Sequence, residues 1–178
     1  MFLFSSSYGT MTMNYFICEV VMRRLLFKQR FFSWFDSYDI YDEAGNVLFV
    51  VKGMLSWGHC LKIFTPQGNE IGMIKERVLT FLPKFELYIQ GRYIGEIKKE
   101  LTFLRPRFTL DCNGWQVQGD VFEWDYSVVD GARMVMHASK QLFNWTDTYV
   151  IEVANDGDVL YSLMIVLAID AAKCSSGQ

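Results

Sequence analysis

The chain has 178 residues, of which 51% are hydrophobic and 16% aromatic, so it is long enough to bury a core without disulfides or metals. This apolar content excludes a disordered chain. The formal net charge of −3, from 17 basic and 20 acidic residues, excludes a uniformly basic nucleic-acid binder, and we do not expect a nucleic acid as partner.

The first 21 residues differ from the rest of the chain. They carry one charge, Glu19, and are rich in Ser, Thr, Met and aromatic residues. A signal peptide would place positive charge before its apolar run, whereas here Arg23 and Arg24 follow it. We therefore expect residues 1–21 to be a disordered leader or a misassigned start, and residues 22–178 to form a single domain.

A repeat dominates the middle of the chain. Glycines occur at positions 45, 68, 91 and 114, a fixed interval of 23 residues, and each stands between two short apolar runs. Asn113-Gly114 and Asp130-Gly131 are strong signals of β-hairpins, because both central residues of a type I′ turn need positive φ. Each unit is thus predicted to be a strand, a glycine turn and a second strand.

The predicted strands cover most of the domain. A first strand is predicted over residues 24–31 and a last one over 149–153. Five hairpins lie between them, over residues 38–52, 61–75, 85–98, 108–121 and 126–138. Phe108 and Leu110 alternate with Thr109 and Asp111, and this period of two is typical of an antiparallel sheet with one solvated face. The prediction is twelve antiparallel strands.

The segment 159–172 is apolar apart from Ser162 and Asp170 and has no polar face, which is typical of a helix surrounded by protein. It is 14 residues long, whereas a helix that spans a bilayer needs about 20. We predict a helix over about 157–173, with Asp156 and Asp158 near its positively polarised start and Lys173 at its end.

The strands and the helix together predict the fold. Twelve strands avoid open edges by closing into a barrel, and a barrel of that size is too wide for strand side chains alone to fill. We expect the apolar helix to occupy the interior of the barrel. The fold class is therefore mainly β: a closed 12-stranded antiparallel β-barrel that encloses a C-terminal apolar α-helix.

Three segments carry a resemblance to a known family: Lys28–Phe32, Ile40–Phe49 and Leu160–Asp170. With the barrel pattern, they resemble the LURP-one-related (YxjI-like) family of the tubby C-terminal-like superfamily, which is similar to phospholipid scramblases. The resemblance covers about residues 22–173 and implies no catalytic motif. It implies binding of phosphoinositide-like headgroups through basic side chains on the barrel exterior. The acidic calcium segment of scramblases has no counterpart here.

No residue pattern indicates catalysis. His59 and Cys60 are adjacent, but neighbours in a strand point to opposite faces, which argues against a nucleophilic pair. The four cysteines form no CxxC pair, and Asn155–Asp158 has its glycine at the wrong place for an EF-hand loop. We expect a non-enzymatic protein with reduced thiols, no catalytic residues, no metal and no cofactor.

Charge is distributed unevenly. Residues 62–107 hold nine basic and five acidic residues, whereas residues 111–170 hold two and ten. In Arg105-Pro106-Arg107, the proline restricts the chain and holds two guanidinium groups near each other, an arrangement suited to phosphate. The candidate residues for binding an anion or a lipid headgroup are Lys75, Arg77, Lys98, Lys99, Arg105 and Arg107.

Two interpretations of these charges stay open. In the first, the chain is a cytoplasmic binding module, peripheral at the membrane, whose basic face binds anionic lipid headgroups or a protein partner. In the second, the charges only keep the outer strand faces solvated, with Glu96, Lys98 and Glu100 in cross-strand pairs. A separate hypothesis is a small-ligand carrier or enzyme that uses a cavity between barrel and helix.

Overall fold

The computed structural model describes residues 22–28, 37–100, 107–143 and 146–174. The expectation for residues 1–21 and the candidate Arg105 lie outside these ranges. Within them, no helix has the length and apolarity that crossing a bilayer requires.

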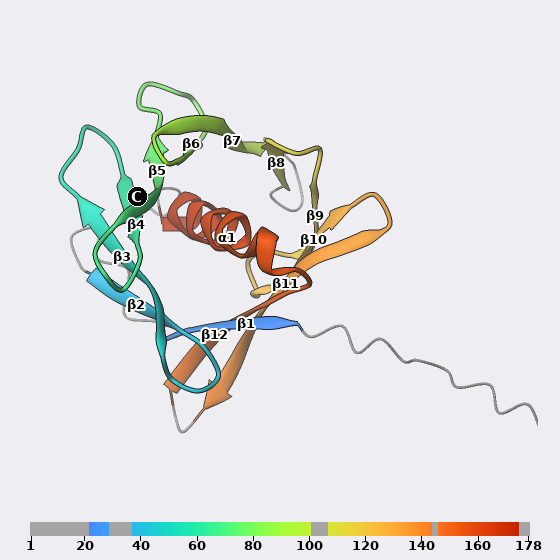
Figure 1. The fold of residues 1–178 in the computed structure, drawn as a ribbon. Helices are drawn as coiled ribbons and strands as arrows, with labels where there is room; N and C mark the ends of the chain where they lie inside the picture. Colours follow the sequence, from blue (N-terminus) through green and yellow to red (C-terminus); the bar gives the residue numbers. More distant parts are fainter. Residues whose placement is uncertain (1–21, 29–36, 101–106, 144–145, 175–178) are drawn as a thin grey trace, which may run out of the picture.

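Twelve strands follow one another along the described chain. Each is antiparallel to its neighbours, and the sheet closes when β1 pairs with both β2 and β12 (Figure 1). The predicted barrel is therefore confirmed. The strands are β1 (Arg23–Lys28), β2 (Ser37–Tyr41), β3 (Val47–Met54), β4 (Cys60–Phe64), β5 (Glu70–Glu76), β6 (Lys84–Ile89), β7 (Arg92–Glu100), β8 (Arg107–Asp111), β9 (Gln116–Asp120), β10 (Asp125–Asp130), β11 (Arg133–Phe143) and β12 (Thr146–Val153).

The 23-residue repeat marks the turns at one end of the barrel. Gly45, Gly68, Gly91 and Gly114 all have φ between +70° and +89°, and a Cβ on any of them would meet no atom within 4 Å. The repeated glycines are therefore explained by the positive φ that these turns require, and not by close packing against a neighbouring atom.

Strand β11 extends further than the sequence pattern indicates. The predicted strand ends at residue 138, whereas β11 continues to Phe143 because β12 pairs with it as far as Phe143↔Thr146. Residues 139–141 are polar, so no alternation of apolar residues marks them as a strand. Backbone pairing with β12 therefore extends this strand beyond the residues that the local sequence pattern predicts.

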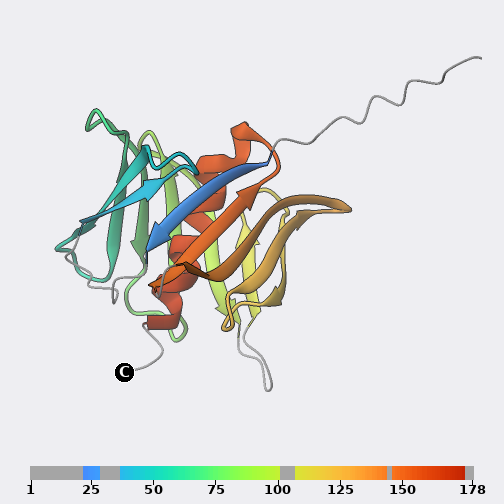
Figure 2. The same cartoon turned by 90° about the horizontal axis from the view of Figure 1, so that it is seen from below.

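The C-terminal helix α1 (Val159–Cys174) runs through the bore of the barrel (Figure 2). Residues 163–169 are at most 1% exposed, in agreement with an apolar helix surrounded on all sides. The helix begins two residues later than predicted, because Asp156–Asp158 form the short 3₁₀ turn η1. The Asp156 and Asp158 carboxylates pair with Arg23 of β1 (3.0 Å) and Arg133 of β11 (3.1 Å), which hold this turn against the barrel.

Gly95 in β7 is a position where a side chain has no room. Its φ is +143°, and a Cβ there would lie 2.3 Å from the Asp111 carbonyl oxygen of β8. We expect Gly95→Ala to lower the free energy of unfolding by about 2–3 kcal/mol in urea titrations. The control is Gly91→Ala, which meets open space and should cost about 1 kcal/mol for its positive φ alone. Equal losses in the two variants would contradict the steric argument.

Candidate functional site

The two ends of the barrel carry different connections. Because neighbouring strands are antiparallel, the odd-numbered strands all run toward the same end. Helix α1 ends there too, since the Lys173 ammonium lies 4.2 Å from the ring centroid of Trp124 in the β9–β10 connection. We call this end the C-terminal rim, and it includes residues 55–59, 77–83 and 121–124 (Figure 2).

The predicted basic residues gather near the C-terminal rim on the three strands β5, β7 and β8. Lys75 and Arg77 lie at and just beyond the end of β5, Lys98 and Lys99 at the end of β7, and Arg107 at the start of β8. The order β5-β6-β7-β8 brings these strand ends side by side. We call this set, without the undescribed Arg105, the basic face.

Lys84 also belongs to this region, although it is not among the residues predicted from the sequence. It begins β6 directly opposite Lys98 of β7. The signal was present, because Lys84 is one of the nine basic residues of the 62–107 stretch. Strand register, which the sequence does not show, places the two lysines together.

Lys84 and Lys98 are held by one nearly buried carboxylate. The Lys84 ammonium lies 2.6 Å from Glu96 Oε2, Lys98 contacts Glu96 Oε1, and the Glu96 side chain is 9% exposed. Burial opposes ionisation of Glu96, yet hydrogen bonds from the two ammonium groups hold the pKa of this carboxyl below its ordinary value. The same contact raises the pKa of Lys98. Lys98 thus takes part in the cross-strand pairing considered above.

Lys75, Arg77 and Arg107 differ from Lys84 and Lys98 in their exposure and in their ion pairing. All three are exposed. Among the residues that the structure describes, no carboxylate lies within the 4.0 Å ion-pair distance of their cationic groups. Lys99 is half-buried opposite Phe108 and has an interaction of its own. The uncompensated positive charge of the basic face therefore comes from Lys75, Arg77 and Arg107.

Arg107 also lines a hollow beside the basic face. Strands β8 and β9 are paired only at Thr109↔Gln116, and a pocket of about 600 Å³ lies along them. Its polar lining includes Arg107, Thr109, Gln116 and Gln118. Guanidinium, hydroxyl and amide groups of this kind bind phosphate and sugar hydroxyls. Glu100, which accepts a hydrogen bond from Thr109, contributes one opposing charge.

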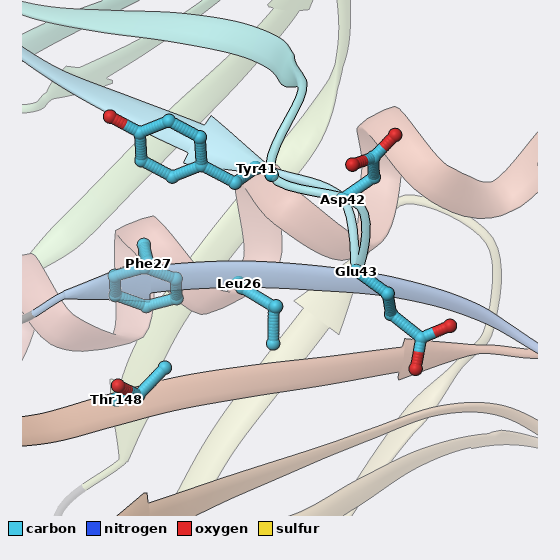
Figure 3. Close-up of a pocket in the computed structure, with 7 residues that line it drawn as sticks. Leu26, Phe27, Tyr41, Asp42, Glu43 and Thr148 are labelled. Carbon is cyan, nitrogen blue, oxygen red and sulfur yellow. The ribbon is translucent and has the colours of Figure 1, made fainter. Parts of the chain in front are cut away.

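A second pocket opens where the barrel closes. Within the described residues, β1 and β2 are paired only at Leu26↔Tyr41. A pocket of about 490 Å³ lies between Leu26 and Phe27 on β1 and the Tyr41–Glu43 turn (Figure 3). Its carboxylates are already occupied: Asp42 accepts hydrogen bonds from Asn46, and Glu43 pairs with Arg24 at 2.9 Å. No described group here is arranged as a catalytic acid, base or nucleophile.

The hypothesis of a cavity between barrel and helix gains no support from these pockets. A third pocket, of about 420 Å³, lies at Met22–Arg24 and the β2–β3 turn. Residues of α1 line none of the three. In the helix, every residue from Leu163 to Ile169 is essentially without solvent exposure.

The thiols of Cys60 and Cys112 are not activated. Burial raises the pKa of both Cys60 and Cys112, whereas a nucleophilic thiol needs a lowered pKa. A ring nitrogen of His59 contacts the Glu76 carboxylate. Among the described residues, no three His, Cys, Asp or Glu side chains are grouped to hold a metal ion.

A closed twelve-stranded barrel filled by its own C-terminal helix defines the tubby-like class of barrel proteins. The chain belongs to the LURP-one-related family, whose family model matches residues 23–170. It is 31% identical over 150 residues to the uncharacterized protein YxjI of Bacillus subtilis (strain 168), and the match covers 84% of this chain and 93% of YxjI.

The fold is also similar to a solved X-ray structure of an Arabidopsis thaliana protein. The TM-score is 0.56 at 15% sequence identity, and the match covers 84% of this chain and 91% of the plant protein. At this identity the likeness concerns the fold alone.

Proposed function

We propose that this protein is a non-enzymatic binding module that associates with anionic lipid headgroups at the cytoplasmic surface of a membrane. The observation that carries the proposal is the set of uncompensated cations on the basic face, Lys75, Arg77 and Arg107. Anionic lipids attract basic residues near the surface by about 1 kcal/mol for each residue.

The arrangement of these cations suits a flat anionic surface. They lie at the ends of β5 and β8 on one rim, with β6 and β7 between them, so a single plane of headgroups can approach all three together. The opposite rim is more acidic, since Asp42, Glu43, Asp156 and Asp158 lie there beside Arg23, Arg24 and Arg133. This polarity orients the basic face toward negative charge. The hollow beside Arg107 adds neutral polar groups for a headgroup.

The test is co-sedimentation of the full chain with vesicles of neutral phosphatidylcholine, with and without phosphatidylserine, at low and high salt. We expect binding only to the anionic vesicles, weakened by salt. Arg77→Gln together with Arg107→Gln should weaken binding about 30-fold, which corresponds to about 2 kcal/mol.

The matched control is Arg92→Gln. Arg92 is also exposed, but it begins β7 at the opposite rim, so its loss should leave vesicle binding unchanged. If the full chain does not bind anionic vesicles at either salt concentration, the lipid proposal is wrong. The basic face would then be a candidate surface for an acidic protein partner.

A further inference from the structure

Two connections at the C-terminal rim expose large apolar side chains. Leu55 and Trp57, between β3 and β4, are 85% and 87% exposed, and Leu79 and Phe81, between β5 and β6, are 99% and 92% exposed. We call these four residues the apolar edge. Elsewhere in the described chain, the exposed large apolar residues are less prominent, as with Tyr93 at 54% and Met134 at 37%. Such a concentration marks an interaction site.

The two connections form one structural unit. The Glu76 amide donates to the His59 carbonyl at 2.7 Å, and the His59 amide donates to the Glu76 carboxylate at 2.9 Å. Gly58 lies so close to Val78 that a Cβ would come within 2.6 Å of the Val78 side chain. The apolar edge is therefore presented by two loops that support each other, and its members lie at the same end of the same barrel wall.

Positive charge lies next to the apolar edge. Arg77 is the first residue of the β5–β6 connection, Lys75 lies near the end of β5, and Lys84 directly follows the connection. Of the carboxylates in this region, Glu76 contacts His59, and Glu86, opposite Lys75 in the strand register, accepts a hydrogen bond from Tyr88. Apolar side chains that include a tryptophan, flanked by uncompensated cations, match the acyl and headgroup layers of an anionic membrane.

The exposure of the apolar edge favours a lipid bilayer over a protein partner. A side chain that is 99% exposed, as Leu79 is, projects away from its own fold on every side. A flat protein surface would cover only one side of such a residue, whereas acyl chains surround it. None of the three pockets described above is lined by the apolar edge.

We propose that the apolar edge inserts into the interface of an anionic membrane while Arg77 and Lys75 bind headgroups beside it. This inference rests on the proposed function and adds the depth and orientation of binding. The C-terminal rim faces the membrane, with the turns marked by the repeated glycines on the far side. Binding then has an apolar component that salt does not remove.

The test combines affinity with insertion depth. We expect Leu79→Ser together with Phe81→Ser to weaken binding of the full chain to phosphatidylserine-containing vesicles at least 100-fold, without lowering the unfolding midpoint. Tyr93→Ser and Met134→Ser are the controls, because they remove exposed apolar groups at the opposite rim and should not change affinity. Vesicles with brominated acyl chains should quench tryptophan emission, and Trp57→Phe should remove most of that quenching.

The outcomes separate the two proposals. If salt-sensitive binding persists, the serine variant binds as tightly as the parent and bromine does not quench, insertion is wrong while the lipid function stands. If the parent does not bind anionic vesicles at all, the proposed lipid-binding function is wrong. If the parent is a dimer in sedimentation and the serine variant a monomer with unchanged vesicle affinity, the apolar edge joins two copies of the chain and insertion is overturned.

Discussion

Replacement of Leu163 or Val166 by Asp is expected to prevent folding. Both side chains are 0% exposed on a helix that the barrel encloses. A carboxylate there has neither water nor a cation to receive it, and its burial costs several kcal/mol, comparable to the total stability of a domain. Far-ultraviolet circular dichroism and thermal unfolding of the purified variants provide the measurement.

The control keeps the volume and the apolar character of the position. Leu163→Met should fold and lose less than about 1.5 kcal/mol. Leu163→Ala should fall between the two, with a loss of about 2–5 kcal/mol, because it leaves a cavity in the bore. A Leu163→Asp variant that melts like the parent would mean that the helix does not fill the barrel.

The second large effect concerns Asp170, a carboxylate on the same buried helix. Asp170 is 8% exposed. Burial raises the pKa of its carboxyl to about 6, although the positive charge of Lys173 acts to lower it. Tyr126 of β10 and Tyr38 of β2 face it from the barrel wall, and burial together with the Asp170 charge raises the pKa of both phenols. The bore therefore contains one ionisable carboxyl that is costly to charge.

The sign of the pH dependence follows from the direction of this shift. A carboxyl with a raised pKa binds its proton more tightly in the folded state, so its contribution favours folding below pH 4 and is lost as pH rises through about 6. A shift from 3.8 to about 6 corresponds to about 3 kcal/mol. Asp170→Asn should therefore stabilise the protein at pH 8 by about 2–3 kcal/mol more than at pH 4.

The measurement is the difference in unfolding free energy between parent and Asp170→Asn in urea titrations from pH 4 to pH 8. The difference isolates Asp170 from carboxyls such as Asp42 and Glu96, whose pKa values are lowered and whose contributions have the opposite sign. The control is Ser162→Ala, at a fully buried position of the same helix without an ionisable side chain, which should change the unfolding free energy by the same amount at every pH. A difference between parent and Asp170→Asn that stays constant with pH would contradict the buried charge.

Features that the sequence could not resolve depend on contacts between distant residues. Residues 47–51 are all apolar, so either face of that strand was a candidate for the core; β3 pairs with β2 and β4 such that Val51 is fully buried and Val50 is not. Lys75 and Lys98 each follow a repeated glycine by seven residues, so the sequence does not distinguish them. The register of β6 and β7 shows that Lys98 shares Glu96 with Lys84. Apolar residues such as Leu79 and Phe81 would ordinarily be assigned to a core.

The sequence by itself determined the number of strands, the positions of their turns and the burial of the C-terminal helix. These features are local, because side-chain alternation, glycines with positive φ and a helix without a polar face act within a few residues. The tertiary structure alone decided which lysines are neutralised, which strand seams open into pockets and which apolar side chains stay in solvent. These depend on register and barrel closure, which bring together residues that no local pattern relates.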